Sequence, residues 1–216
     1  MPRLSYEQET ARQEKMKETE KRLKGEGYRF IAGVDEAGRG PLAGPVYAAA
    51  VILPEDVRLD GINDSKKLSP KKREELFEEI TKKAISYAVY SVDEKKIDEI
   101  NILRATHMAM NGAVLSLSQK PDYVIIDGNS ISGMELPHET LVKGDAKSIS
   151  IAAASILAKV SRDRYITKMA EIYPEYQFEK HKGYGTKEHI EAILKYGASP
   201  IHRKTFLKKI LEKEKS

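Results

Sequence analysis

The sequence contains no cysteine, which excludes disulfide bonds, thiolate nucleophiles and cysteine-ligated zinc. It carries little net charge, since 37 basic and 33 acidic residues leave +4, so any contact with nucleic acid must come from local basic clusters. Its longest apolar runs, residues 42–53 and 149–158, are too short to cross a bilayer, and its N-terminus has no apolar signal-peptide core. These absences predict a soluble, cytoplasmic protein that makes no contact with a membrane.

The chain length and the distribution of charge indicate one main domain. With 216 residues, of which 40% are hydrophobic, the chain can form one well-buried domain and a small appendage. We predict a charged N-terminal helical extension over residues 1–27, which lies on the surface or frays. Residues 28–216 are expected to form the main domain, which ends in helices.

Apolar patterns along the main domain alternate between those of strands and those of helices. Strands are expected at about 29–35, 45–53, 85–92, 123–127 and 139–142. Helices are expected from residue 70 and at about 94–98, 102–118, 147–171, 186–196 and 204–213. This order predicts an α/β fold in which a mixed central β-sheet is flanked by α-helices.

Two adjacent acids, Asp35 and Glu36, follow the apolar residues 31–34 at the end of the first expected strand. Neighbouring carboxylates repel each other as they lose water, and paired oxygen ligands suit magnesium or manganese. On a regular strand the two side chains point to opposite faces, so we expect either a break helped by Gly38 and Gly40, or a backbone carbonyl that completes the site. A surface turn after an edge strand is the alternative interpretation.

Two further acids stand at junctions between expected elements. Asp127 ends the run 123–127, whose lack of alternation predicts a strand buried on both faces, and α/β sheets bind ligands at the carboxyl ends of such strands. Asp145 precedes the long helix expected at 147–171. Each has a plainer alternative, a turn for Asp127 and a helix N-cap for Asp145. If the strands at 29–35 and 123–127 are neighbours, their ends converge on one metal-binding cavity.

Basic residues in glycine-rich or polar loops indicate contacts with a polyanion. Arg39 lies between glycines, so the backbone there can approach a sugar or phosphate closely. The loop 63–67 carries two lysines that are either solvated or neutralise phosphates. Tyr184 stands at the centre of the basic loop 181–186, where a stacking platform for a sugar or base explains it better than a core position does.

Six motifs follow one another along the chain: Gly33-Val34-Asp35-Glu36-Ala37-Gly38-Arg39-Gly40, Asn63-Asp64-Ser65-Lys66-Lys67-Leu68, Ile126-Asp127-Gly128, Lys143-Gly144-Asp145, Ala153-Ala154-Ser155-Ile156-Leu157-Ala158-Lys159 and His181-Lys182-Gly183-Tyr184. In this order, from about residue 30 to residue 206, they resemble the ribonuclease HII family, the type 2 ribonucleases H. The resemblance implies the ribonuclease H-like fold, dependence on divalent metal, and endonucleolytic cleavage of RNA paired with DNA. It also implies incision at single ribonucleotides embedded in duplex DNA.

The resemblance also implies roles for individual residues. The catalytic residues, which are also the metal ligands, would be Asp35, Glu36, Asp127 and Asp145. The substrate-binding residues would be Gly38, Arg39, Gly40, Lys66 and Tyr184. In this assignment the glycine–arginine–glycine segment contacts the ribonucleotide, Lys66 binds phosphate and Tyr184 reads the ribose.

We predict phosphodiester hydrolysis with two divalent ions, Mg²⁺ or Mn²⁺, about 3.5–4 Å apart, which activate a water and stabilise the leaving 3′ oxygen. Asp35 is expected to bridge the ions, with Glu36 and Asp127 on one ion and Asp145 on the other. The resemblance implies 5′-phosphate and 3′-hydroxyl products. The expected partner is an RNA–DNA hybrid or a ribonucleotide-containing DNA duplex, and the expected oligomeric state is a monomer.

Two other functions are compatible with parts of the pattern. In a non-catalytic nucleic-acid-binding module, the acids are only caps and turns, and chelation of metal has no effect. A phosphohydrolase that acts on a small molecule is the second alternative, but two basic glycine loops far apart in sequence favour a long polyanion. The five histidines show no metal-ligand spacing, and His107 is expected in the core because it falls on an apolar helix face.

Overall fold

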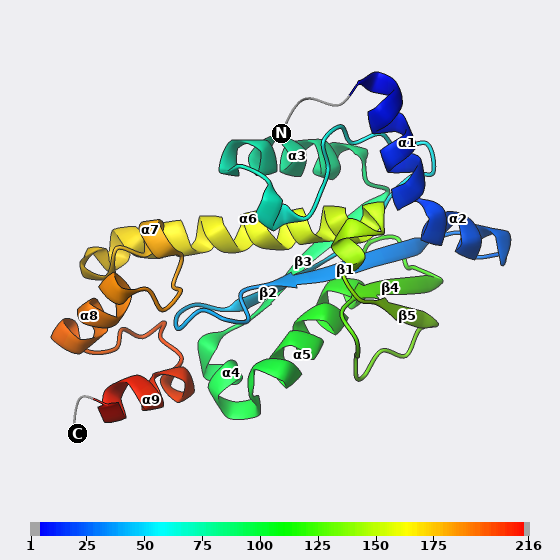
Figure 1. Ribbon diagram of the computed structural model, residues 1–216. Helices are drawn as coiled ribbons and strands as arrows, with labels where there is room; N and C mark the ends of the chain where they lie inside the picture. Colours follow the sequence, from blue (N-terminus) through cyan, green and yellow to red (C-terminus); the bar gives the residue numbers. More distant parts are fainter. Residues whose placement is uncertain (1–4, 214–216) are drawn as a thin grey trace.

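The computed structural model describes residues 5–213, apart from the side chains of residues 209 and 213, and Figure 1 shows how its elements are arranged. The helices are α1 (Tyr6–Met16), α2 (Glu18–Gly25), α3 (Pro70–Lys83), α4 (Glu94–Ile100), α5 (Ile102–Leu115), α6 (Ile149–Ile172), α7 (Phe178–His181), α8 (Lys187–Tyr196) and α9 (Lys204–Lys213), with 3₁₀ helices η1 (Ser65–Lys67), η2 (Gly144–Ala146) and η3 (Pro174–Tyr176). The strands are β1 (Ile31–Ala37), β2 (Val46–Ile52), β3 (Ser86–Val92), β4 (Tyr123–Asp127) and β5 (His138–Leu141). The predicted strands and helices of the main domain are confirmed, whereas the sequence pattern missed α7 and the 3₁₀ helices. None of the described helices is long and apolar enough to span a membrane.

The five strands form one mixed sheet in the order β3-β2-β1-β4-β5. β2 runs antiparallel to β1 and β3, whereas β4 runs parallel to β1 and β5. The β1–β4 pairing begins with Ile31 opposite Tyr123 and ends with Val34 opposite Ile126, so the carboxyl ends of these strands lie side by side. Residues 124–126 are fully buried, as expected for a strand covered on both faces. The predicted α/β fold with a mixed central sheet is therefore confirmed.

Helices cover both faces of the sheet (Figure 1). α6 packs along β1 and β2 on one face, while α5 packs against β2 and β3 on the other. Gly33 on β1 leaves no room for a side chain, because a Cβ there would collide with the backbone of Ser150 and Ile151. The first turn of α6 therefore lies directly on the strand that carries the paired acids.

β1 does not break at its two acids, contrary to one of the two expectations for this strand. Its pairing with β2 continues to Ala37, although its pairing with β4 stops at Val34. The chain leaves the strand only at Gly38, whose φ of 100° is a backbone conformation that favours glycine. The paired acids thus lie on a continuous strand, at the point where its β4 side is no longer hydrogen-bonded to the neighbouring strand.

The N-terminal extension forms two helices, α1 and α2, that pack against the main domain. Met16 and Leu23 are buried in the core. The carboxylate of Glu20 accepts hydrogen bonds from Ser148 Oγ (2.6 Å) and from the Ser150 amide (3.1 Å), and so caps the first turn of α6. The extension is therefore joined to the helix that lies directly on β1.

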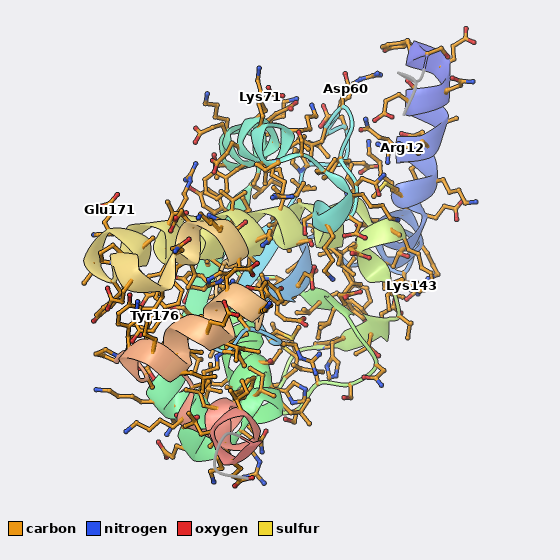
Figure 2. The ribbon with its side chains drawn as sticks, turned by 60° about the vertical axis from the view of Figure 1, so that its left-hand side comes forward. Arg12, Asp60, Lys71, Lys143, Glu171 and Tyr176 are labelled. Carbon is orange, nitrogen blue, oxygen red and sulfur yellow. The ribbon has the colours of Figure 1, made fainter. Side chains whose placement is uncertain are left out.

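α1 also supports the loop between β2 and α3. Gln13 donates to the Asp60 carboxylate (3.2 Å) and accepts from the Leu59 amide (3.0 Å), while Glu9 accepts from the Gly61 amide (2.9 Å). Figure 2 shows Asp60 on this loop, next to α1. The expectation that the extension frays is wrong because these buried polar contacts hold it, whereas the division of the chain after residue 27 stays a prediction.

Candidate active site

Three carboxylates gather at the carboxyl ends of β1 and β4. Asp35 and Asp127 each follow directly after the last β1–β4 pair, Val34 with Ile126. Asp35 is only 5% exposed, while Glu36 and Asp127 are half-buried. The parallel pairing of the two strands thus brings together acids that are far apart in sequence, as the sequence analysis expected.

Burial and mutual repulsion raise the pKa of two of these acids. Burial raises the pKa of Asp35 well above its ordinary value, the charges of Glu36 and Asp127 raise it further, and a hydrogen bond with Ser155 opposes the rise. Burial also raises the pKa of Glu36, where the Arg39 guanidinium opposes the shift and Asp127 adds to it. Such a cluster is unfavourable when all its members are ionised, so a cation that binds there stabilises it.

Asp145 lies in η2, between β5 and α6, and interacts with Asp127, one of these three acids. Its pKa is raised by burial and by the charges of Asp64 and Asp127, whereas Lys66 opposes the rise. η2 is held beside β4 because the Gly144 amide donates to Asp127 Oδ1 (2.6 Å). The structure therefore brings Asp145 to the acidic cluster and adds Asp64, to which the sequence analysis assigned no role.

The acidic cluster has the donor chemistry that a hard divalent cation requires. Its four predicted members offer carboxylate oxygens, which magnesium and manganese prefer. Among residues 5–213, however, no group of three or more acidic or histidine side chains is already arranged to hold an ion. Protein contacts occupy some oxygens, since Asp35 accepts from the Glu36 amide (2.7 Å) and Glu36 Oε1 lies 3.4 Å from Arg39 Nη1.

The glycine–arginine–glycine segment follows β1 directly and borders the acids. Gly38 is buried against the side chain of Arg162, which leaves no space for a Cβ, whereas Arg39 and Gly40 are exposed. A Cβ on Gly40 would lie 3.6 Å from Cε1 of Tyr184, whose side chain is itself 44% exposed. The predicted substrate residues of the two distant loops therefore adjoin on one accessible surface.

Lys66 belongs to η1, which is joined to α6 beside the acids. Its amide donates to Asp64 Oδ1 (2.9 Å), and its side chain is exposed. The hydroxyl of the buried Ser65 lies 3.0 Å from that of Ser155, the residue that also hydrogen-bonds Asp35. These contacts place a flexible basic side chain at the edge of the acidic cluster.

A pocket adjoins the acids on the side of α5. Its lining includes Glu36, Arg39 and Asp127, together with His107 from α5 and Asn129 from the loop after β4. His107 is buried, as its apolar helix face predicts, and burial lowers its pKa. The sequence did not indicate that His107 and Asn129 lie beside the acids, because neither residue stands in a spacing typical of a ligand set.

Comparisons with known proteins agree with this geometry. The family model described as Ribonuclease HII matches residues 32–209 of the chain. Ribonuclease HII of Caldicellulosiruptor saccharolyticus is 63% identical over 194 residues, which cover 90% of this chain and 95% of that protein. The crystal structure of ribonuclease H2 from Pyrococcus horikoshii OT3 matches with a TM-score of 0.72 and 33% identity, over 87% of this chain and 100% of that chain. A structure of Bst-RNase HIII in complex with Mn²⁺, 19% identical over 86% of this chain and 70% of that chain, shares the fold with a TM-score of 0.61.

The sheet order, the helices on both faces and the acids at the ends of β1 and β4 define a nuclease with the ribonuclease H-like fold. Proteins of this class act on nucleic acid and depend on divalent metal. Within it, the chain belongs to the ribonuclease HII family, whose members are endoribonucleases that act on RNA–DNA hybrids. The resemblance seen in the six sequence motifs is confirmed.

Proposed function

We propose that this chain carries out the family's hybrid cleavage, and incises DNA duplexes at single embedded ribonucleotides, with Asp35, Glu36, Asp127 and Asp145 as its metal ligands. The observation that carries the proposal is the place of Asp35, a carboxyl buried beside two further acids at the ends of parallel strands, where burial and their charges raise its pKa. Crowding of this kind lowers the stability of the metal-free protein, and binding of a divalent cation offsets the loss.

Each acid has a distinct place in the proposed site. Asp35 is the most deeply buried of the four, and in the proposed site it would contribute to holding both ions, while Glu36 and Asp127 would hold one ion and Asp145 the other. When bound, the ions supply a water of lowered pKa and charge stabilisation for the leaving 3′ oxygen. The proposed products carry a 5′-phosphate and a 3′-hydroxyl.

The proposed ribose reader is the surface formed by Gly38–Gly40 and Tyr184. Among the described residues, the amides of Arg39 and Gly40 have no hydrogen-bond partner, so they remain available to a 2′-hydroxyl, the group that distinguishes RNA from DNA. The ring of Tyr184 can pack on the adjacent sugar, while Lys66 and Arg39 contact phosphates and supply salt-dependent affinity.

The test is incubation with a DNA duplex that contains one ribonucleotide, in Mg²⁺ or Mn²⁺, with and without EDTA. We expect a single cut at the ribonucleotide, no cut in an all-DNA duplex and no cut in EDTA. Asp145→Asn is expected to abolish turnover while it spares duplex binding, because Gly38–Gly40, Lys66 and Tyr184 remain in place. Near-normal turnover of this variant removes Asp145 from the site, and cleavage in EDTA overturns the metal assignment.

The proposal has four further parts. We infer that two ions, Mg²⁺ or Mn²⁺, serve the reaction, that the protein acts as a monomer, and that it works in the cytoplasm. We also infer that residues 28–216 form the catalytic domain, to which residues 1–27 add a helical extension. Analytical ultracentrifugation and metal titration of the cleavage rate test the oligomeric state and the ion preference.

A further inference from the structure

The segment Ser199–Arg203, between α8 and α9 in Figure 1, contacts one of the two loops that we propose to read the ribose directly, and the other through His189 of α8. The Arg203 amide donates to the Leu42 carbonyl (2.9 Å), and the Gly44 amide donates to the Ile201 carbonyl (2.8 Å). The segment therefore pairs, backbone to backbone, with the chain that follows the glycine–arginine–glycine segment.

The side chain of Arg203 extends this contact to the ribose-reading segment itself. Its guanidinium is fully buried and donates to four backbone carbonyls, those of Gly38 (2.6 Å), Arg39 (3.0 Å), Pro41 (2.8 Å) and Gly44 (2.9 Å). A planar group with five donors can satisfy this set at once, whereas a lysine ammonium cannot. The turn after β1 is thus folded around one guanidinium.

A chain of hydrogen bonds leads from the same segment to the backbone of Tyr184. His202 Nδ1 accepts from the Ser199 amide (2.9 Å), so the neutral ring carries its proton on Nε2 and donates it to His189 Nε2 (3.0 Å). His189 is then protonated on Nδ1, which donates to the Tyr184 carbonyl (2.9 Å). Burial lowers the pKa of both histidines to about 4, which keeps the two rings neutral. Tyr176, labelled in Figure 2, packs on His202 with its ring centroid 5.0 Å away.

The two loops are also bonded to each other. The Leu42 amide donates to the Gly183 carbonyl (2.7 Å), and the buried Arg162 donates to the carbonyls of Ala43 (3.1 Å) and Lys182 (3.1 Å). A shift of either loop therefore moves the other, so the supporting contacts act on one rigid surface.

We propose that Arg203, together with the His202–His189 pair, positions the Gly38–Gly40 segment relative to Tyr184 and so sets the preference of the site for ribose. Arg203 binds the carbonyls of Gly38 and Arg39, whereas the amides of Arg39 and Gly40, both exposed residues, are not used in this contact. These are positioning residues, because they act through the backbone of the residues that would touch the nucleotide. The inference rests on the ribose-reading role proposed above.

The test measures two quantities for the purified full chain. The first is kcat and KM for a duplex with one ribonucleotide. The second is the ratio of Kd values for the all-DNA duplex and the ribonucleotide duplex in EDTA. For Arg203→Lys, which retains the charge, we expect kcat to fall by about 10- to 100-fold, because small displacements at a reacting centre have effects of this size. We expect its binding preference for the ribonucleotide to vanish, while its Kd for all-DNA duplex changes by less than about threefold.

A pair of substitutions at His189 tests the contribution of the His202–His189 pair while Arg203 is left unchanged. His189→Asn can keep a donor near the Nδ1 position, so we expect it to retain most of the ribose preference. His189→Leu has no donor, so we expect it to lose that preference. If Arg203→Lys does not fold, this pair decides the question.

Leu207→Ala is the matched control for stability. Leu207 is buried in an apolar cluster formed largely by the C-terminal part of the chain, so its truncation lowers Tm. Its side chain makes no hydrogen bond to either loop. We expect it to leave kcat and the binding preference unchanged. An equal loss in this control, at a similar Tm, overturns the inference, as does an unchanged preference in both Arg203→Lys and His189→Leu. If the unaltered protein neither cleaves nor prefers the ribonucleotide duplex, it is the proposed function that fails.

Discussion

Two regions of the molecule each concentrate charge of one sign, negative in one and positive in the other, and they differ in how that charge is compensated. At the ends of β1 and β4, Asp35 and Glu36 repel each other and Asp127, and burial raises their pKa values. Below the turn after β1, the buried guanidinium groups of Arg162 and Arg203 donate to backbone carbonyls. We propose that a cation from outside the chain compensates the acidic region, whereas backbone carbonyls of the chain itself satisfy the basic region.

The difference separates a site from its support. A buried charge without sufficient partners lowers stability and can be offset by a ligand, which is what a binding site requires. A buried charge that meets several carbonyls instead fixes the backbone around it, because each carbonyl would be costly to leave unpaired. The four predictions below test whether the two regions behave as differently as their hydrogen bonds indicate.

The largest effect is expected at Asp35. Asp35→Asn removes a ligand and should lower the cleavage rate by about 10³-fold or more, since several kcal/mol of charge stabilisation is lost. The same change relieves repulsion, so in EDTA we expect Tm to rise by roughly 2–4 °C, the shift that about 1 kcal/mol produces in a domain of this size. Steady-state kinetics on the single-ribonucleotide duplex measures the loss of rate, and differential scanning calorimetry in EDTA and in Mg²⁺ measures the change in Tm. A lower Tm in EDTA contradicts the view that this region is strained.

Removal of a charge from the basic region should lower the stability of the protein instead of raising it. Arg203→Met leaves four carbonyls without their donor, so we expect the free energy of unfolding to fall by about 3 kcal/mol or more. Urea titration followed by circular dichroism measures this loss. Arg39→Met is the control, because its exposed guanidinium should contribute no more than about 0.5 kcal/mol to stability. Equal effects of the two changes contradict a supporting role for Arg203.

Low pH should reduce the free energy of unfolding, because the two buried histidines become protonated. His189 and His202 have pKa values of about 4 in the folded protein, below the ordinary 6.5, so the unfolded chain binds more protons between these values. Their contribution is therefore complete above about pH 6.5 and is lost as the pH falls toward 4, by about 3 kcal/mol for each residue.

Urea titrations between pH 4 and 7 measure this dependence, and comparison with His189→Asn isolates it from the protonation of carboxylates. We expect the variant to lose less stability over that interval than the unaltered protein. Identical slopes for the two proteins would exclude His189 as a source of the acid sensitivity.

The smallest effect is expected at Tyr184, whose exposed ring lies beside Gly40. Tyr184→Phe keeps the ring and should lose only a few-fold in kcat/KM, whereas Tyr184→Ala should lose about tenfold or more, since stacking of a base or sugar on an aromatic ring contributes about 1–3 kcal/mol. Steady-state kinetics on the single-ribonucleotide duplex distinguishes the two. An equal loss in both variants assigns the contribution to the hydroxyl instead.

The sequence was informative where function depends on local pattern. Asp127 ends an unbroken apolar run, and that run predicts both the buried strand β4 and the place of the acid at its carboxyl end. Ser69 and Pro70 likewise predict the start of α3, because a capping serine followed by proline is typical of a helix N-terminus. The acids and the elements that carry them were therefore predictable without coordinates.

The support was not predictable, because its contacts join distant parts of the chain through groups with no pattern. Arg203 donates to the Gly38 carbonyl, 165 residues away in sequence. No sequence pattern marks which backbone carbonyl will accept such a hydrogen bond. His189 and His202 show no ligand spacing, and only the packing of α8 against the following segment brings their rings together. The sequence left open whether β1 breaks at its acids, because the continuity of the strand through Glu36 depends on its pairing with β2.

The cap that Glu20 places on α6 has a consequence for biosynthesis. The residue it contacts, Ser148, is 128 positions further along the chain, so at 5–20 residues per second the ribosome needs roughly 6–25 s to deliver it. During that interval Met16 and Leu23 have no α6 to pack against. We therefore expect the nascent N-terminal helices to lack these contacts until the start of α6 has left the ribosome.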